Sequence, residues 1–344
     1  MRRPPGFLTL MVALGVGALA LFIAECALGP VHIPPHRVIA AMMGTGTDIE
    51  NAILFQIRIP RALLGVAVGA SLALAGAALQ GLFRNPLAEP GLIGVTAGAS
   101  LGAVIVIVLG TTLAGGVPAA LRPFLLPLAA FVGGAAVIAV LFALVQWSRG
   151  PGVATLILAG VAINAIVAAA IGVLIYIADD QQLRDLTFWT MGSLSVADHA
   201  LIIAVLVPAV LIIPVFLGCA RGLDQLQLGE RAAFHTGLNV GRARLTIAFA
   251  TAISVGAVTS AAGPIGFIGL VAPHIARMLV GPLHRHLMPA SALLGICLVL
   301  VADLGVRLAV PPAEPPIGLA TSLIGGPFFL WLLLRQVSRG RSLA

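Results

Sequence analysis

The chain has 344 residues, of which 60% are hydrophobic and only 9% are charged, and its net charge is +7. Soluble domains carry about 25% charged residues, so the composition excludes a water-soluble protein and indicates an integral membrane protein. All 19 basic residues are arginine. Without lysine the chain has neither a Walker A loop nor a Schiff-base lysine. If ATP drives this protein, a separate chain must bind ATP and Mg²⁺, and this chain is expected to bind no cofactor.

Ten apolar segments follow one another in a hydropathy window of about 19 residues. Most approach the roughly 20 residues that one crossing of the bilayer requires. The seventh and eighth are short and separated by Gly263-Pro264, so a broken or re-entrant pair is an alternative there. The segments lie near residues 7–29, 62–83, 92–113, 124–147, 153–177, 197–219, 245–262, 266–281, 287–309 and 316–335. The predicted fold is an all-α integral membrane protein in which residues 1–344 form a single transmembrane domain.

Both ends of the chain are expected to face the cytoplasm. The apolar run after Met1-Arg2-Arg3 is longer than the h-region of a signal peptide, about 7–15 residues, so we expect it to remain as the first span. An even number of spans places both ends on one side, and cytoplasmic ends place 13 of the 19 arginines inside, as the positive-inside rule requires. The outer arginines are then Arg37, Arg58, Arg61, Arg122, Arg184 and Arg307. The charge therefore indicates orientation in a lipid bilayer rather than binding to nucleic acid.

Two polar stretches contain residues that break helices. Asn85-Pro86 and Pro90 follow the second span and are expected to turn the chain at the membrane boundary. Gly263-Pro264 and Pro273 interrupt the helical pattern at membrane depth, where irregular backbone is tolerated only beside protein or water. We interpret Asn85, Pro86, Pro90, Gly263, Pro264 and Pro273 as structural turns.

A third polar stretch lies in the long cytoplasmic loop 220–243. Gly229 and Gly237 bracket a short amphipathic segment there, which predicts a helix at the membrane surface. A helix of this kind can insert into a groove of a partner protein. The alternative is an interfacial anchor that contacts only lipid.

The motifs from about Arg58 to the C-terminus resemble, in order, the FecCD-type permease subunits of ABC importers for iron chelates and vitamin B12. Beside the three polar stretches, the matching motifs are Trp189–Leu194, Ala302-Asp303-Leu304, Pro316-Ile317-Gly318 and Gly325–Leu330. The resemblance implies a type II ABC importer permease fold with ten helices in the bacterial inner membrane. It also implies four partners in addition to lipid: a second permease copy, as a homodimer, two cytoplasmic ATPase subunits and a periplasmic substrate-binding protein.

The resemblance also assigns roles to particular residues. ATPase coupling falls to Leu228, Gly229, Glu230, Arg231, Ala232, Ala233 and Gly237, with Glu230 and Arg231 as surface contacts. Docking of the binding protein, through its glutamates, falls to Arg58, Arg61 and Arg307. The translocation path falls to Asn164, Trp189, Gly192 and Ser193, with a gate near Thr187–Ser195.

Each of these assignments has a structural alternative. Arg58 and Arg61 can instead cap the second span and extend their charge to the interface. Asn164 can form a hydrogen bond between helices instead of lining a path. Asp303 and Glu25 are the only carboxylates that the predicted spans place within the membrane, and the i,i+4 spacing of Asp303 and Arg307 predicts an ion pair.

Other functional classes find little support in the sequence. An ion-coupled secondary transporter needs unpaired acidic residues in the membrane, and a membrane enzyme needs a catalytic signature such as His-Glu-x-x-His, which is absent. Cys26, Cys219 and Cys297 lie far apart, and His284-Arg285-His286 has no acidic or cysteine ligand nearby in sequence, so no metal site is predicted. His32 and His36 remain candidates for meeting a haem ligand. The expected substrate is an iron complex, a ferric siderophore or haem, with vitamin B12 as the alternative.

Overall fold

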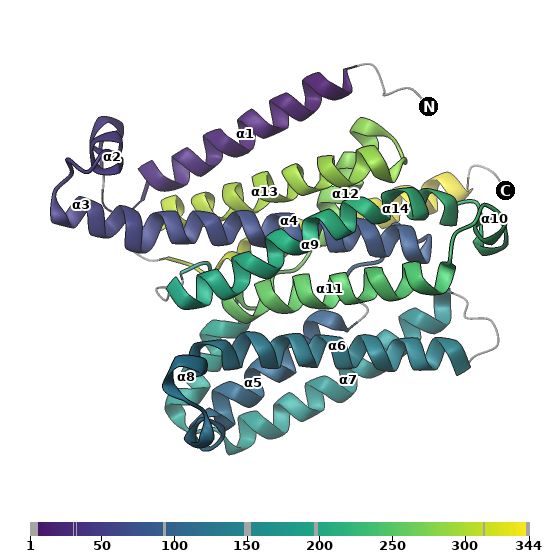
Figure 1. Cartoon of the computed structure of the whole chain (residues 1–344), viewed down its shortest axis with the longest axis horizontal. Helices are drawn as coiled ribbons and strands as arrows, with labels where there is room; N and C mark the ends of the chain where they lie inside the picture. Colours follow the sequence, from purple (N-terminus) through teal and green to yellow (C-terminus); the bar gives the residue numbers. More distant parts are fainter. Residues whose placement is uncertain are drawn as a thin grey trace.

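The computed structural model describes residues 6–29, 31, 33–91, 94–147, 153–195, 199–311 and 314–341, and these ranges form helices and loops without strands (Figure 1). The predicted all-α fold is confirmed. The helices are α1 (Phe7–Ala27), α2 (Pro35–Met42), α3 (Asp48–Ala52), the π-helix η1 (Ile53–Arg58), α4 (Ile59–Phe83), α5 (Val95–Leu113), the 3₁₀ helices η2 (Ala114–Gly116) and η3 (Ala119–Phe124), α6 (Leu125–Trp147), α7 (Val153–Ile177), α8 (Asp180–Thr190), α9 (His199–Leu226), α10 (Glu230–His235), α11 (Val240–Ala262), α12 (Ile268–Val280), α13 (His284–Ala309) and α14 (Ile317–Arg341). The predictions that concern Arg2, Arg3 and His32 lie outside the described residues.

Each of the ten predicted segments overlaps one helix of the structure. Within the described ranges, seven helices are long and apolar enough to cross a membrane, and three shorter apolar helices accompany them. The shorter ones are Val95–Gly110, Ile268–Val280 and Ile317–Trp331. They correspond to the third, eighth and tenth segments of the sequence prediction.

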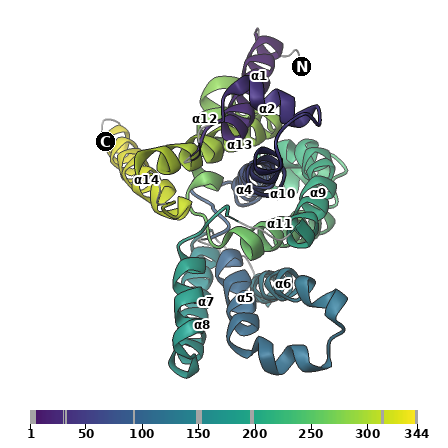
Figure 2. The same cartoon turned by 90° about the vertical axis from the view of Figure 1, so that its left-hand side faces the viewer.

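Helix α4 forms the centre of the bundle and packs against α13, α9, α11 and α12, as the end view in Figure 2 shows. Its small residues allow backbones to touch. A Cβ atom at Gly69 would lie 2.5 Å from the carbonyl oxygen of Gly295 in α13, and one at Gly76 would lie 1.8 Å from that of Gly269 in α12. Such close packing replaces the hydrophobic drive that lipid cannot supply.

The contact between Gly76 and the α12 backbone is the closer of the two and can be tested by mutation. Gly76→Ala is expected to lower the free energy of unfolding by about 1–3 kcal/mol or more, because the added methyl group overlaps the α12 backbone. Thermal unfolding of the purified protein in detergent measures the loss. Gly17→Ala in α1 is the control, since nothing lies within 4 Å of a Cβ there. Equal midpoints for the two variants would contradict the close packing of α4 on α12.

Different helices lie at the two ends of the bundle. The start of α1, the end of α14 and α10 lie at one end, and α2, α3 and α8 lie at the opposite end (Figure 1). We refer to these as the α10 end and the α8 end. The start of α1 and the end of α14 thus lie on one side, which agrees with an even number of crossings.

The predicted loop 220–243 is largely helical. Helix α9 continues to Leu226, and α11 begins at Val240, where the Asn239 side chain accepts a hydrogen bond from the Arg242 backbone. The segment between them holds α10. It begins after Gly229 with φ of 99°, and Gly237 has φ of 87°. Both angles favour glycine, so the two predicted glycine boundaries correspond to real turns.

Candidate functional site

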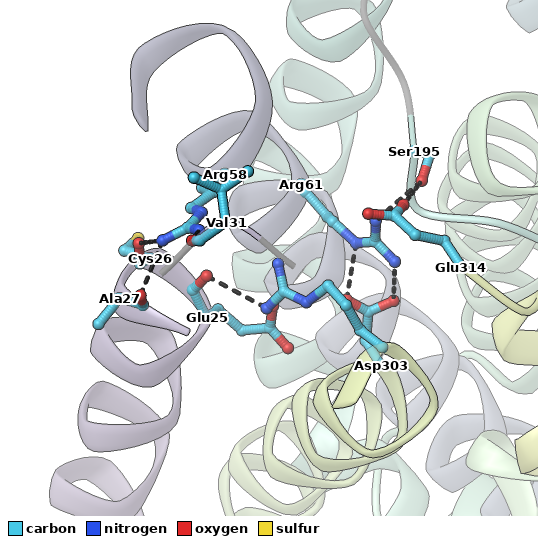
Figure 3. A network of polar contacts seen from close by, with 10 residues as sticks. Glu25, Cys26, Ala27, Val31, Arg58, Arg61, Ser195, Asp303 and Glu314 are labelled. Atoms are coloured by element: carbon cyan, nitrogen blue, oxygen red, sulfur yellow. Dashed lines mark hydrogen bonds and ion pairs between the residues drawn. The ribbon is translucent and has the colours of Figure 1, made fainter. Parts of the chain in front are cut away.

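A buried ion pair connects α4 and α13 at the α8 end (Figure 3). Arg61 donates from Nε to Oδ2 of Asp303 at 2.8 Å and from Nη2 to Oδ1 at 2.9 Å. Arg61 is 3% exposed and Asp303 is 1% exposed. The planar guanidinium fork matches the carboxylate in a bidentate manner, so the charges are neutralised and both carboxylate oxygens are bonded.

The same arginine reaches the surface through its third nitrogen. Arg61 Nη1 donates to Ser195 Oγ at 2.9 Å and pairs with Glu314. Ser195 in turn donates to Glu314 at 3.0 Å, and the Glu314 side chain is 35% exposed. Partial burial on its own raises the pKa of Glu314, but the hydrogen bond and charge of Arg61 outweigh it and hold that pKa below its ordinary value. This contact therefore stabilises the fold at neutral pH and is lost as the pH falls through the lowered pKa.

A second set of contacts ties α1 to the same network. Arg307 of α13 pairs with Glu25 of α1, and both are buried. Arg58 donates to the carbonyl oxygens of Cys26 at 3.0 Å and Ala27 at 2.7 Å. It therefore satisfies carbonyl groups at the C-terminus of α1, which have no partner within the helix, and its positive charge suits that end of the helix dipole.

The structure corrects the predicted ion pair between Asp303 and Arg307. Asp303 does not pair with Arg307, because Arg61 occupies both of its oxygens and Arg307 reaches across to Glu25. Arg58, Arg61 and Arg307 do lie in one network, but each is at most 3% exposed and holds internal partners. This burial argues against side chains that extend their charge to the interface, and the docking role of the three arginines stays a prediction.

Glu314, the most accessible part of the network, was not selected from the sequence, and Ser195 was named only as the end of the gate segment Thr187–Ser195. Glu314 lies beside Pro315 in the Pro-rich loop before α14, on the side to which the outer arginines were assigned. An acidic residue in an outer loop close to predicted docking arginines was the available signal. Its partner could not be read from the sequence, because Arg61 and Glu314 are 253 positions apart.

Helix α10 and the turn before it each expose one large apolar side chain at the α10 end. Ala233 is fully buried against the main core, whereas Leu228 and Phe234 are 72% and 70% exposed. Glu230 pairs with Arg244 at the start of α11, which fixes α10 against that helix. The helix therefore stands where coupling residues were predicted, with Phe234 and the preceding Leu228 uncovered in this chain.

The predicted path residues are held by backbone contacts. Trp189 Nε1 donates to the Ser260 carbonyl oxygen at 3.4 Å, and the Ser193 backbone donates to that of Ala262 at 2.8 Å. Gly192 has φ of 73° and is buried between them. Asn164 Nδ2 donates to the Gly91 carbonyl oxygen at 3.2 Å, so this amide does have a structural hydrogen bond. A role of these residues in transport stays a prediction.

The two predicted breaks meet around a cavity of about 170 Å³. Asn85 Oδ1 accepts from the Leu87 backbone at 3.0 Å, and the turn continues to Pro90 at the cavity wall. On the other side Gly263 has φ of 68° and is followed by Pro264. Glu89 joins the two segments, since its Oε1 accepts from the Phe267 backbone at 2.7 Å.

Pro273 does not break the chain, which corrects the prediction of a turn there. It lies inside α12, where a proline deprives the carbonyl group four residues earlier, that of Gly269, of its usual donor. Gln80 of α4 replaces that donor, with Nε2 3.3 Å from the Gly269 oxygen. Arg277 in turn donates to Gln80 Oε1 at 2.9 Å. The helix continues because a neighbouring helix satisfies the freed group.

Because Gln80 replaces the donor that Pro273 lacks, the effects of mutating these two residues on the free energy of unfolding should not be additive. Gln80→Leu is expected to cost about 1–3 kcal/mol of unfolding free energy, because the Gly269 oxygen is left unsatisfied. In a Pro273→Ala background, which restores the backbone N–H, the same change should cost about 1 kcal/mol less. The free energies of unfolding of the two single variants and the double variant, measured beside the parent, form a double-mutant cycle. Strict additivity would show that Gln80 does not compensate for Pro273.

Many helices that are long and apolar enough to cross a bilayer define the molecule as a polytopic membrane protein. The FecCD transport family matches residues 17–335, and the chain belongs to this family. It is 45% identical to the hemin transport system permease protein HmuU of Yersinia pestis, over 93% of this chain and 95% of that protein. It is 36% identical to the vitamin B12 import system permease protein BtuC of Vibrio cholerae, over 92% of each.

A solved structure agrees with this assignment. The structure, described as an inward-facing conformation of a metal-chelate type ABC transporter, has a TM-score of 0.81 and 29% identity, and covers 95% of this chain and 99% of that chain. The fold is that of a type II ABC importer permease. The protein is a multi-pass protein of the inner membrane and a transport subunit rather than an enzyme.

Proposed function

We propose that the protein is the permease subunit of a binding-protein-dependent ABC importer that carries an iron complex, haem or a ferric siderophore, across the inner membrane. The observation that carries this proposal is the 45% identity with a hemin permease over nearly the whole of both chains. The lack of lysine agrees with ATP hydrolysis in separate ATPase subunits. Vitamin B12 is the second candidate substrate, on the strength of the 36% identity with a vitamin B12 permease.

Ligand-stimulated ATP hydrolysis separates these substrates. The permease is reconstituted in proteoliposomes with its ATPase and binding protein, and haem, ferrichrome and cyanocobalamin are added in turn. Haem is expected to stimulate hydrolysis about tenfold more than cyanocobalamin, a difference that a few contacts in a binding site supply. Stimulation by cyanocobalamin alone would overturn the iron-complex proposal in favour of the second candidate.

The α10 end is proposed to face the cytoplasm, with both chain ends, and to contact the ATPase subunits through α10. The excess of arginine on that side supports the orientation. The uncovered Phe234 of α10 supports the contact, together with Leu228 just before the helix, because apolar side chains at a short surface helix suit insertion into a partner's groove. Binding of two permease copies to each other is proposed to involve α7 and α14, which both carry exposed large apolar side chains.

Docking of the binding protein is proposed to occur at the α8 end by exchange of carboxylates on Arg61. Glu314 is partly exposed and holds the outer nitrogen of that arginine, so an incoming carboxylate of the partner must displace it. Glu314→Gln is expected to increase the affinity of the binding protein about threefold to tenfold, because the internal competitor loses its charge. Binding is measured with the permease in nanodiscs. A decrease in affinity would instead identify Glu314 as a direct docking contact.

A further inference from the structure

The last turn of α9 contacts two helices at the α10 end of the bundle. Asp224 Oδ1 accepts a hydrogen bond from the His284 backbone at 2.7 Å and lies 2.9 Å from Nδ1 of the same residue. His284 is the first residue of α13, and the residue before it, Leu283, has no side chain that can cap the helix. Asp224 therefore supplies from another helix the negative N-terminal cap that α13 lacks.

Gln227, the residue that follows α9, also holds the C-terminus of α4. Its Nε2 donates to the Gly81 carbonyl oxygen at 3.2 Å, and the same oxygen accepts from the Arg84 backbone at 3.3 Å. The His284 ring packs directly on Gly81, since a Cβ atom there would lie 2.4 Å from its Nε2. Asp224, Gln227 and His284 thus join the ends of α4, α9 and α13, and we call them the inner clamp.

The inner clamp is continuous with α10. Only Gln227, Leu228 and Gly229 separate the end of α9 from the start of α10. Ala233 of α10 is fully buried in the same core cluster as Leu223 and Leu226 of α9. Because these side chains are packed together, α10 cannot shift without displacing the last turn of α9.

Helices α4 and α13 extend from the inner clamp to the opposite end of the bundle. Their backbones touch at Gly69 and Gly295, and their far ends carry the bidentate pair of Arg61 and Asp303. Both helices are thus fixed to α9 at the α10 end and to each other at the α8 end. When the ends of α4 and α13 beside α10 are displaced, the two helices therefore move together as one packed unit.

We propose that Asp224, Gln227 and His284 are positioning residues of energy coupling, which transmit the movement of α10 to α4 and α13 and through them to the Arg61–Asp303 network. This inference rests on the proposed contact between α10 and the ATPase. The residues touch neither substrate nor ATP. Their loss should therefore separate ATP hydrolysis from movement at the α8 end, rather than abolish either hydrolysis or folding.

The test follows the far end of α13 while ATP is turned over. A fluorophore is attached at Leu308→Cys, a position that is 47% exposed near the end of α13, after Cys26, Cys219 and Cys297 are replaced by alanine. The complete complex with its ATPase is held in nanodiscs, and the fluorescence change on trapping with ATP and vanadate is recorded beside the rate of hydrolysis. In Asp224→Ala the fluorescence change should fall about tenfold, as expected for loss of a charge-assisted contact, with hydrolysis within about twofold of the parent.

Two further variants make the result specific. Asp224→Asn keeps an oxygen that accepts from the His284 backbone and should restore most of the fluorescence change. Thr47→Ala removes the side-chain cap of α3 at the other end of the protein and should leave the fluorescence change intact. A similar decrease in Thr47→Ala would show that loss of any helix cap produces the effect and would overturn the proposal.

The remaining outcomes are equally informative. A full fluorescence change in Asp224→Ala, or none in the parent protein, would overturn the proposed transmission. Hydrolysis and fluorescence that fall together in Asp224→Ala, with the ATPase no longer co-purifying, would make Asp224 a residue of assembly and also overturn it. Failure of the parent protein to bind the ATPase would instead refute the proposed role of α10.

Discussion

Asp303→Ala is expected to destabilise the protein by about 3–5 kcal/mol, because it leaves a buried arginine without its bidentate partner. Arg61 is 3% exposed and keeps only Ser195 and Glu314 at its outer nitrogen. Thermal unfolding in detergent and the yield of folded protein measure the effect. ATP-driven uptake in proteoliposomes should fall in parallel, because the pair joins α4 to α13.

The control for this prediction replaces the pair as a whole. Substituting apolar residues for both members of a buried pair is often neutral or stabilising, whereas removing one is costly. Arg61→Met with Asp303→Leu is therefore expected to recover much of the stability that Asp303→Ala loses. Uptake should stay low in the double variant if docking requires Arg61. A single Asp303→Ala variant as stable as the parent would show that the pair does not hold the two helices together.

Phe234→Asp is expected to abolish the association of the permease with its ATPase while leaving the permease folded. The side chain is 70% exposed in this chain, so a carboxylate there costs the isolated subunit little. In a partner's groove the same carboxylate would be buried without a counter-ion. Loss of a central apolar contact weakens an interface by about 2–4 kcal/mol, or roughly 30-fold to 1000-fold. Co-purification and ATPase-dependent uptake measure the loss.

Met43→Asp is the matched control for Phe234→Asp. Met43 is 77% exposed, and it follows α2 at the α8 end. The substitution therefore introduces the same charge at an exposed apolar position far from α10. It should leave association with the ATPase unchanged. Normal association of Phe234→Asp would place the ATPase contact elsewhere.

Local pattern sufficed to locate the long apolar helices but not the short helices α2, α3 and α8. Hydropathy located all ten apolar segments, since a span must be apolar along its whole length whatever its neighbours are. The glycines on either side of α10 were informative for the same reason: Gly229 and Gly237 both take positive φ. Helix ends that depend on packing were predicted less well. Helix α9 extends to Leu226, seven residues beyond the predicted end of the sixth span at residue 219.

Contacts between residues far apart in the chain could not be predicted from the sequence. The i,i+4 spacing of Asp303 and Arg307 was a sound local argument, but Arg61 is 242 positions from Asp303 and forms the better pair. The break predicted at Pro273 failed for the same reason, since Gln80 lies on another helix. A local rule is overridden wherever a neighbouring helix supplies a partner with suitable geometry.

The pairing of the intramembrane carboxylates also bears on the competing class of transporter. Glu25 pairs with Arg307, and Asp303 pairs with Arg61. A coupling site for protons or sodium needs an acidic group that can exchange its partner during transport. Both predicted intramembrane carboxylates instead act in contacts between helices, which favours transport driven by ATP.

The energy source of uptake is the most direct test of the proposed ATP-driven import. Haem uptake is measured in proteoliposomes that contain the permease, its ATPase and its binding protein, with ATP enclosed on the side of α10. We expect uptake to stop when vanadate traps the ATPase and to continue when an uncoupler dissipates the proton gradient. Uptake that continues with vanadate and stops with the uncoupler would contradict ATP-driven import and identify a secondary transporter.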